Sequence, residues 1–306
     1  MDTMPVSPPT WATPILSGRL TRLEPLRPDH VDGLVRAATE DRRSYEYTGV
    51  PATRKAMADY VETALAERDH GLVVPFVLHD LRPGRGGIVG CTRFLDLDFW
   101  RPTGGQGEQG RTFQHVTISH SWTDAHTSPA GDSSLASTVT VRTVTGSTTI
   151  ASRGDTEDSA SSREAAEEHT RPCRTTDGDP ACSATPAASP SSSASGDLST
   201  PPSVVEVGAT WLAASAQRTG INVEAKLLLL GHAFDTWNAL RVCLKTDVRN
   251  HRSRMAIERL GGRFEGIRRA HMLAIDGTAR DSAYYSILGE EWPQVRTSLL
   301  ARLTRN

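Results

Sequence analysis

Hydrophobic residues recur at regular spacing in two flanks of the chain, 1–100 and 204–306. Spacings of three and four residues predict helices with one buried face, and alternation predicts strands. In the first flank we expect, in chain order, a strand over 20–26, a helix over 30–39, a helix from an N-cap at Thr53 to Gly71, and strands over 73–79 and 88–97.

The second flank continues the alternation of strands and helices. We expect, in chain order, a strand over 204–212, a helix over 222–237 capped by Asn222, a strand over 240–246, a helix capped by Asn250 and stopped by Gly261, a hairpin over 264–288 and a helix from Glu291. On the first of these strands, one face is expected to carry Val205, Val207, Ala209 and Trp211, and the other face Glu206. The pattern predicts a mixed α/β (α+β) fold.

The middle of the chain has a different composition. Within 151–200, Ser, Thr, Ala, Pro and Gly account for 33 of 50 residues. Such a segment buries too little apolar surface to offset backbone ordering at about 1–2 kcal/mol per residue, so we expect disorder. Alternating Val and Thr over 138–144, together with apolar residues in 113–118, indicate a small hairpin within the otherwise poorly ordered region.

We therefore predict one domain in two parts, 1–100 and 204–306, separated by a low-complexity insert over 101–203. A single domain with a long surface insertion is favoured over two domains, because the cost of closing a loop grows only slowly with its length.

Charge and cysteine content exclude several classes of protein. The chain has 34 Lys and Arg against 36 Asp and Glu, a net charge of −2, so no nucleic-acid-binding tail is indicated. No apolar run is long enough for a membrane span, and the N-terminal residues do not resemble a signal peptide. The four cysteines lack zinc spacing, as do His115, His120 and His126, so we expect a cytoplasmic protein with reduced thiols and no metal.

The turn between the strand over 204–212 and the following helix is a candidate anion site. Backbone N–H groups and the helix dipole converge at a helix N-terminus, and Arg218 adds a full positive charge. The Gly-Lys-Ser/Thr sequence of ATP-binding loops and the three-glycine dinucleotide pattern are both absent from this turn. ATP and NAD are therefore poor candidates for the ligand.

The six residues of this turn resemble the acetyl-CoA loop of the GNAT N-acetyltransferase superfamily, Gln/Arg-x-x-Gly-x-Gly/Ala. They are Gln217, Arg218, Thr219, Gly220, Ile221 and Asn222, and the last departs from the family pattern. Two further blocks are similar to the RimJ/RimL-like branch: the first is Asn250, Ser253 and Glu258 to Gly261, and the second is Asp281 and Tyr285 to Ile287. The resemblance implies a single GNAT domain with a splayed, mostly antiparallel sheet, and acetyl-CoA as acyl donor.

Carried over by position, the resemblance implies a cofactor site. The backbone of the loop from Gln217 to Asn222 would cradle the pyrophosphate of CoA. The pantetheine arm would lie along the strand residues Val207, Ala209 and Trp211. Asn250 would bond the pantetheine, cap its own helix, or do both. Arg252 belongs to a basic cluster, with Lys245, Arg249, Arg254, Arg268 and Arg269, that would flank the 3′-phosphate of CoA; RNA is the alternative ligand for this cluster.

Three residues are candidates for the chemistry. Glu206 is the candidate base that accepts the amine proton, with a salt-bridged or solvated strand glutamate as the alternative. The tyrosine that many GNAT enzymes use as an acid is replaced here by Ile257. Ser253 is the substitute donor to the leaving thiolate, or a local structural hydroxyl. Tyr285 is a further donor, or a buried core residue.

The sequence thus predicts an acetyl-CoA-dependent N-acetyltransferase. A protein or peptide N-terminal α-amino group is the leading acceptor, because the best-known members of the branch acetylate protein N-termini and because an α-amine needs only a weak base. A small-molecule amine acceptor and a catalytically silent CoA-binding protein remain alternatives. The acceptor, the oligomeric state and the purpose of the insert stay open.

Overall fold

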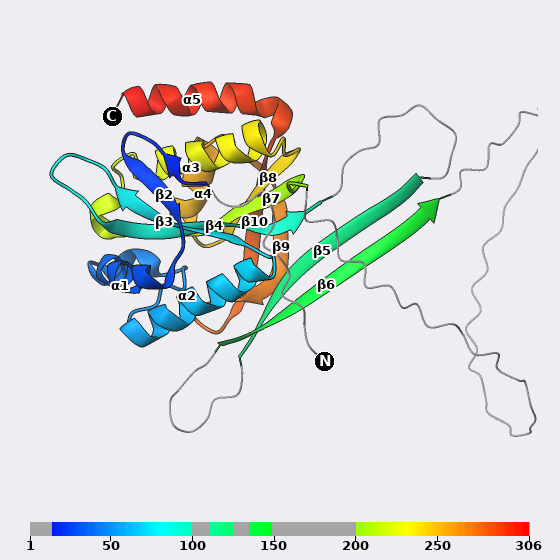
Figure 1. Ribbon diagram of the computed structural model, residues 1–306, viewed down its shortest axis with the longest axis horizontal. Helices are drawn as coiled ribbons and strands as arrows, with labels where there is room; N and C mark the ends of the chain where they lie inside the picture. The colour runs from blue at the N-terminus through cyan, green and yellow to red at the C-terminus, as the bar shows by residue number, and fades with distance from the viewer. Residues whose placement is uncertain (1–13, 100–110, 125–134, 149–199, 306) are drawn as a thin grey trace, which may run out of the picture.

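The computed structural model describes residues 14–99, 111–124, 135–148 and 200–305 (Figure 1). Its elements in chain order are β1 (Leu16–Ser17), β2 (Thr21–Pro25), η1 (Pro28–His30), α1 (Val31–Thr39), η2 (Arg42–Tyr45), α2 (Arg54–Asp69), β3 (Val74–Asp80), β4 (Ile88–Asp98), β5 (Arg111–Asp124), β6 (Leu135–Thr148), β7 (Val204–Leu212), η3 (Ala214–Ala216), α3 (Ile221–Gly231), η4 (His232–Thr236), β8 (Arg241–Asp247), α4 (His251–Arg259), β9 (Arg263–Leu273), β10 (Ala279–Leu288), η5 (Gly289–Glu291) and α5 (Trp292–Thr304). No helix in these ranges combines the length and the apolar character that a membrane span requires.

Eight strands form one open sheet in the order β1-β2-β3-β4-β7-β8-β10-β9. All neighbouring pairs in this sheet are antiparallel except β7 and β8, which run parallel. The β7–β8 ladder covers only the first three residues of β7, from Val204↔Arg241 to Glu206↔Cys243, and the two strands then part. The predicted mixed, mostly antiparallel and splayed sheet is confirmed.

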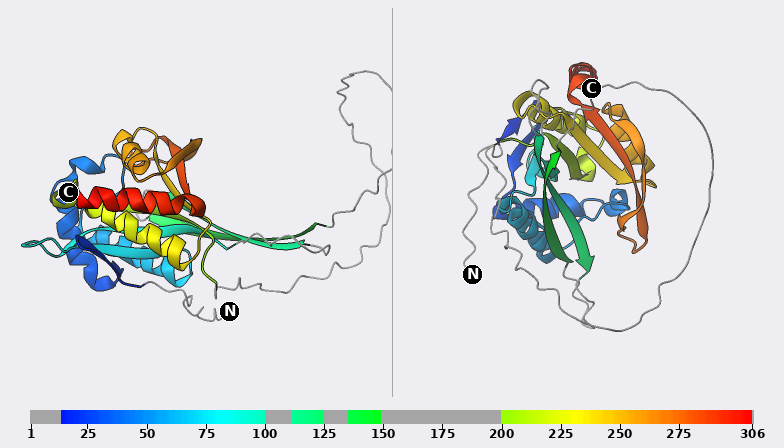
Figure 2. Two further views of the ribbon diagram at one scale, coloured as in Figure 1. Left: turned by 90° about the horizontal axis from the view of Figure 1, so that it is seen from above. Right: turned by 90° about the vertical axis from the view of Figure 1, so that its right-hand side faces the viewer.

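Helices cover both faces of the sheet. Helices α1 and α2 lie on one face, and α3 lies on the other with α5 alongside it (Figures 1 and 2). On the α3 face, the ring of Phe94 packs 4.6 Å from Trp237 and 6.1 Å from Phe76, centroid to centroid. Residues from both flanks of the chain pack in one hydrophobic core.

The cap residues confirm two predicted helix starts and correct a third. Thr53 accepts a hydrogen bond from the Ala56 N–H at 3.2 Å at the start of α2, and Asn250 accepts one from the Ser253 N–H at 2.9 Å at the start of α4. Helix α3, however, begins after Gly220 rather than Asn222. Gly220 adopts a φ of +88°, a conformation that glycine tolerates best, and this turns the chain into the helix two residues earlier.

A β-bulge in β7 corrects the predicted faces of that strand. Cys91 pairs with Trp211 and Arg93 with Gly208, so Thr92 alone opposes both Ala209 and Thr210. The extra residue inverts the alternation beyond it. Trp211 therefore lies on the α1/α2 face with Glu206, and not on the face of Val207 as expected.

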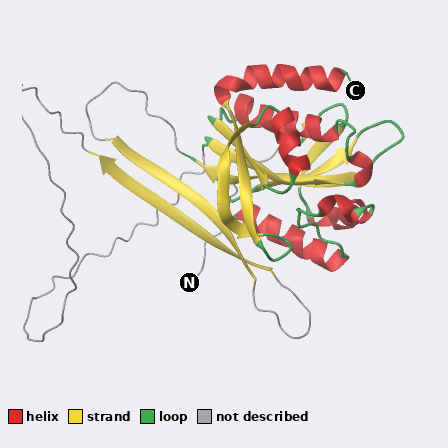
Figure 3. Ribbon diagram, turned by 180° about the vertical axis from the view of Figure 1, so that it is seen from behind, coloured by secondary structure: helices red, strands yellow, loops and turns green. Residues whose placement is uncertain are grey.

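The predicted small hairpin in the middle of the chain is confirmed. Strands β5 and β6 form a separate two-stranded antiparallel sheet, with Val116 opposite Thr143 and Ile118 opposite Val141. This sheet extends away from the larger one (Figure 3). The segment 149–199, for which disorder is expected, lies outside the described residues.

The core reaches one residue further into the middle of the chain than the predicted boundary at 203. Ser203 is fully buried; its N–H donates to the Asp98 carbonyl at 2.8 Å, and its own carbonyl accepts from the Leu240 N–H at 2.7 Å. Ser203 therefore ties the end of β4 and the start of β8 together.

Replacing residues 101–200 by a short Gly/Ser linker is expected to leave a folded domain. Strands β4 and β7 pair directly from Gly90↔Leu212 to Asp98↔Val204, so the linker would join two adjacent strand ends. Circular dichroism and thermal melts of the shortened and full chains test this. Loss of the fold, or a melting temperature lowered by more than a few degrees, would show that 101–200 contributes to the core.

Candidate active site

The loop between β7 and α3 carries two left-handed residues. Arg218 has a φ of +62° and Gly220 a φ of +88°. Left-handed residues of this kind turn successive backbone N–H groups toward a common point, and the first N–H groups of α3 lack an intrahelical acceptor. Arg218 is exposed, and its guanidinium forms no ion pair within the part of the chain that the structure describes. The loop thus fits an anion such as a pyrophosphate.

Side chains from both flanks hold this loop in place. The Gln217 amide nitrogen donates to the Ser44 hydroxyl and to the Leu212 carbonyl, each at 2.8 Å, and its oxygen accepts from Arg252. The carboxylate of Glu40 accepts from the N–H and the hydroxyl of Ser215 at 3.0 and 3.1 Å. The loop conformation is therefore fixed by the protein itself before any ligand binds.

Glu224, which the sequence pattern did not single out, fixes the N-terminus of α3. It is buried, and its carboxylate accepts the backbone N–H groups of Arg19, Leu20 and Thr21 at 2.6 to 2.9 Å. The only sequence signal for this role is the position of Glu224 in the first turn of a helix. That signal does not reveal that its partners are backbone N–H groups at 19–21.

The parting of β7 from β8 opens backbone groups beside the loop. The bulge at Ala209 and Thr210 lies beyond the last β7–β8 pair, and the extra residue of a bulge leaves the ladder. Ala209 is exposed and has a φ of +47°, a conformation that costs a non-glycine residue about 1–2 kcal/mol. Free backbone donors at this point can bind a carbonyl oxygen.

Glu206 lies at the point where the two strands part, on the α1/α2 face. Lys245 Nζ lies 2.7 Å from its Oε2 and 2.9 Å from Asp96 Oδ2. Burial raises the pKa of Glu206 to about 7, while the charge of Lys245 opposes the shift and Asp96 adds to it. Burial by itself lowers the pKa of Lys245, but the two carboxylates outweigh burial and raise that pKa. Lys245 therefore stays charged while Glu206 titrates near neutral pH.

Gly208 keeps space free beside this carboxylate. A Cβ atom added at Gly208 would lie 2.7 Å from Glu206 Oε1. A carboxylate near pKa 7 with room at one oxygen is suited to accept a proton.

The candidate residues of α4 lie at its first turn. Asn250 uses its side-chain oxygen as a helix cap, which leaves its amide N–H groups for a ligand. The Ser253 hydroxyl is partly exposed and makes no hydrogen bond among the described residues. Both the capping reading and the ligand reading of Asn250 remain compatible with this geometry.

Tyr285 lies on the opposite face of the sheet from Glu206. Cys243 pairs with Glu206 and lies two residues from Lys245 on β8, whereas Tyr285 pairs with Leu244 on the other face. Tyr285 is fully buried; its hydroxyl donates to Glu258 at 3.2 Å and accepts from Arg254 at 3.1 Å. The sequence analysis gave Tyr285 as either a proton donor or a buried core residue, and this environment corresponds to the second.

Ion pairs remove two members of the expected basic cluster. Lys245 is held by Glu206 and Asp96, and the Arg249 guanidinium lies 2.7 Å from both Asp247 and Asp276. Arg252, which contacts the loop through Gln217, keeps its place beside the candidate phosphate site.

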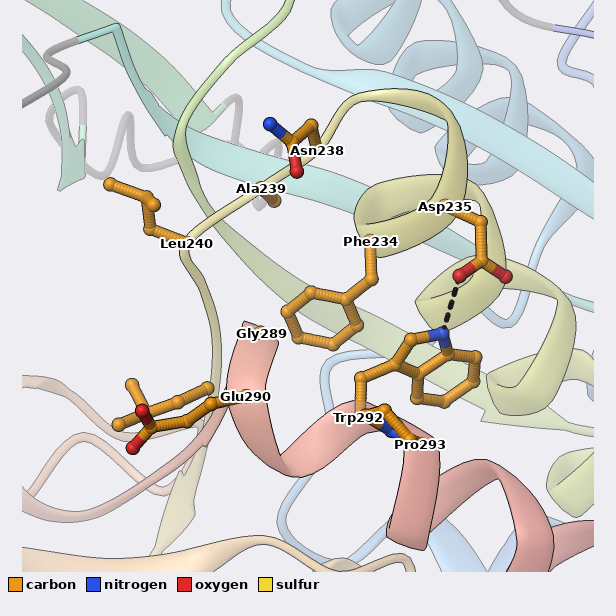
Figure 4. Close-up of a pocket in the computed structure, with 10 residues that line it drawn as sticks. Phe234, Asp235, Asn238, Ala239, Leu240, Gly289, Glu290, Trp292 and Pro293 are labelled. Atoms are coloured by element: carbon orange, nitrogen blue, oxygen red, sulfur yellow. Dashed lines mark hydrogen bonds between the residues drawn. The ribbon is translucent and has the colours of Figure 1, made fainter.

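A surface hollow of about 570 Å³ lies at the other end of the parallel strand pair (Figure 4). The chain just before β8 borders this hollow, whereas the loop between β7 and α3, the candidate phosphate loop, follows the end of β7. Trp292 Nε1 donates to Asp235 at 2.7 Å inside the hollow, and Phe234 stacks on the Trp292 ring. None of the candidate catalytic or cofactor-binding residues predicted from the sequence lines this hollow.

One group of potential metal ligands lies apart from this site. Glu24, His30 and His79 bring one ligand atom each within 4.8 Å of one another. The Arg27 N–H donates to His30 Nδ1 at 3.2 Å, so the neutral ring carries its proton on Nε2, the one nitrogen left for a metal. Arg22 pairs with Glu24 at 2.5 Å. These contacts hold Glu24 and His30 in place, whereas the Nε2 atoms of His30 and His79 are buried without a hydrogen-bond partner among the described residues.

Comparisons with known proteins agree with this geometry. Residues 189–263 match the family model of the acetyltransferase (GNAT) domain. No curated protein matches the chain in sequence.

Solved structures share the fold at low sequence identity. A GCN5-related N-acetyltransferase from Brucella melitensis has a TM-score of 0.54 and 21% identity, covering 94% of this chain and 84% of that chain. RimJ from Mycobacterium smegmatis, in complex with CoA-disulfide, has a TM-score of 0.53 and 17% identity, covering 96% of each chain.

Residues 189–263 thus match a GNAT acetyltransferase domain, and the strand order and the parted parallel pair agree with this match. This match and the acetyltransferase structures that share the fold support an enzyme of the N-acetyltransferase class.

Gly220→Val is expected to weaken acetyl-CoA binding by more than tenfold, about 1.4 kcal/mol or more. A side chain there would block the approach of phosphate to the loop backbone, and its Cβ would lie 2.9 Å from Leu20 Cδ1 at an unfavourable φ. Titration calorimetry measures the affinity. The matched control is Gly84→Val, which has a φ of +70° and open space around it, so it carries backbone strain away from the loop. Unchanged affinity in Gly220→Val would refute the phosphate-loop assignment.

Proposed function

We propose that this protein transfers the acetyl group of acetyl-CoA to a primary amine, and that the amine is a protein or peptide N-terminal α-amino group. The observation that carries the proposal is the buried Glu206 at the point where β7 parts from β8, three residues before the bulge that frees backbone donors. This arrangement brings a proton acceptor and a carbonyl-binding backbone to one place.

The residues of the chain fit acetyl-CoA as the acyl-donor substrate. The left-handed residues of the phosphate loop and Arg218 suit its pyrophosphate, and the open stretch of β7 suits its pantetheine arm. When bound, acetyl-CoA would supply a thioester as the activated acyl group. Among the solved structures with this fold, the M. smegmatis RimJ contains a CoA-disulfide, which supports a CoA ligand.

Glu206 would take the amine proton, directly or through one water. The amine nitrogen then forms a bond to the thioester carbon and the carbon–sulfur bond breaks. Backbone N–H groups of the bulge would stabilise the negative charge that develops on the carbonyl oxygen. The nitrogen then loses its second proton to solvent, and Ser253 or solvent would give a proton to the leaving thiolate.

The pKa of Glu206 favours an α-amine as acceptor. An α-ammonium group has a pKa of about 7.7–8.0, whereas a lysine side chain has one of about 10.4. A base with a pKa of about 7 takes the proton of the first over a gap of roughly one unit, and that of the second over more than three units. The free thiols of Cys91 and Cys243 fit a cytoplasmic location.

An acceptor screen by CoA release tests the proposal. The full chain is assayed with peptides that have a free N-terminus, with N-terminally blocked peptides that contain a lysine, and with small amines. Faster release with free N-termini is expected. CoA release with small amines alone would show that the acceptor is a small-molecule amine and not a protein N-terminus. No release with any amine, despite acetyl-CoA binding, would indicate a catalytically silent CoA-binding protein.

Glu206→Gln is expected to lower kcat by roughly 10²- to 10⁴-fold and to leave acetyl-CoA affinity nearly unchanged. The wild-type rate should rise as the pH increases through about 7, because only the deprotonated carboxylate accepts a proton, and the variant should lose this dependence. Glu62→Gln, an exposed position on α2, is the control. Wild-type turnover in Glu206→Gln would exclude the role of base.

Ser253→Ala is expected to cost less activity than Glu206→Gln, because water can protonate a CoA thiolate at this partly exposed position. Initial rates, with melting temperature and acetyl-CoA affinity as checks, compare the two variants. Complete loss of turnover in a folded, acetyl-CoA-binding Ser253→Ala protein would make Ser253 the more important residue.

A further inference from the structure

A buried lysine lies beneath the β7 bulge on the face opposite Glu206. Lys226 projects from α3, its exposed fraction is 5%, and it forms no ion pair within the described residues. Its Nζ donates to Thr210 Oγ1 at 2.6 Å and to Thr92 Oγ1 at 3.3 Å. Burial lowers the pKa of Lys226 to about 7, and its charged and neutral forms both offer at least two N–H donors.

The two threonines belong to the bulge itself. Thr92 is the β4 residue that opposes the extra residue, and Thr210 is one of the two β7 residues opposite it. Their hydroxyl oxygens lie 2.7 Å apart, and both lie within 3.4 Å of the Gly208 carbonyl oxygen. Whichever hydroxyl donates to the other, one hydroxyl hydrogen remains for that carbonyl. The network therefore holds the peptide group between Gly208 and the strained Ala209, and the Thr210 side chain on the other side of Ala209.

The core alone does not account for a lysine at this place. A buried amine without a carboxylate partner is costly, and an apolar side chain of similar length would fill the same space at lower cost. The other buried positions of α3 are apolar apart from Glu224, which has its own three backbone partners. A role for Lys226 as hydrogen-bond donor to the polar groups of the bulge, from the α3 side of the sheet, explains why a lysine occupies this position.

We propose that Lys226 is a positioning residue for the acyl donor: through Thr210 and Thr92 it holds the β7 bulge in the shape that presents backbone N–H groups to the thioester carbonyl. The proposal rests on the proposed function, because it assigns the thioester to the bulge. It concerns the carbonyl of the donor and leaves the phosphate loop unaffected.

Calorimetric titration of the full chain with acetyl-CoA and, separately, with CoA distinguishes binding of the thioester carbonyl from binding at the phosphate loop. CoA has the same phosphates and pantetheine but no thioester carbonyl. In Lys226→Met we expect acetyl-CoA affinity and kcat each to fall about tenfold, less than the 10²- to 10³-fold lost when an oxyanion donor itself is removed. Affinity for CoA should stay within about twofold of the wild type. Lys55→Met, at an exposed position on α2, is the matched control.

Thr92→Val removes the hydroxyl without touching the lysine and should show the same selective loss. The double variant should lose little more than either single variant, since both act through one bulge. If Lys226→Met fails to fold, Thr92→Val decides.

Equal losses for both ligands, or no loss for either, would overturn the role of Lys226. Failure of the wild-type protein to bind either ligand would instead overturn the proposed function and its acyl donor.

Discussion

The site depends on one parallel pair of strands within an otherwise antiparallel sheet. Parallel neighbours need a crossover connection, and α3 supplies it between the end of β7 and the start of β8. The N-terminus of α3 must therefore lie at the end of β7, where the strands have already parted. This single constraint brings free helix N–H groups, free strand N–H groups and the entrance between the strands to one end of the sheet.

The two faces of β7 serve different purposes. Glu206 and Trp211 face α1 and α2, where the Trp211 ring meets Tyr45 at 6.0 Å. Thr210 faces α3, where its partners are polar and buried. The bulge between these residues is what allows a strand of nine residues to present Glu206 and Trp211 on one face and Val207 and Thr210 on the other.

Local signals predicted most of the fold. Helix caps at Thr53 and Asn250, alternation in the strands and the stop at Gly261 each depend on a few neighbouring residues, and the structure agrees with them. The sequence also indicated the candidate phosphate loop over 217–222 and Glu206 as the candidate base, although it did not identify Lys245 and Asp96 as the partners of Glu206.

The missed features depend on distant residues. The bulge arises from the pairing of Thr92 with β7, and no local pattern announces it. Nothing in the local sequence marks Glu224 and Lys226 as buried, but α3 lies between the sheet and α5 and buries charged residues as well. Their partners are on strands up to about 200 residues away in the chain.

The long separation of β4 from its partner β7 has a consequence for biosynthesis. When Asp98 leaves the ribosome, the strand that will cover the β4 edge has not yet been made. At about 5–20 residues per second, the roughly 100 intervening residues take on the order of 5–20 s to synthesise. During that interval β4 lacks its partner, and an unpaired strand edge is the kind of surface that pairs with other chains. Every newly made copy must pass through this interval.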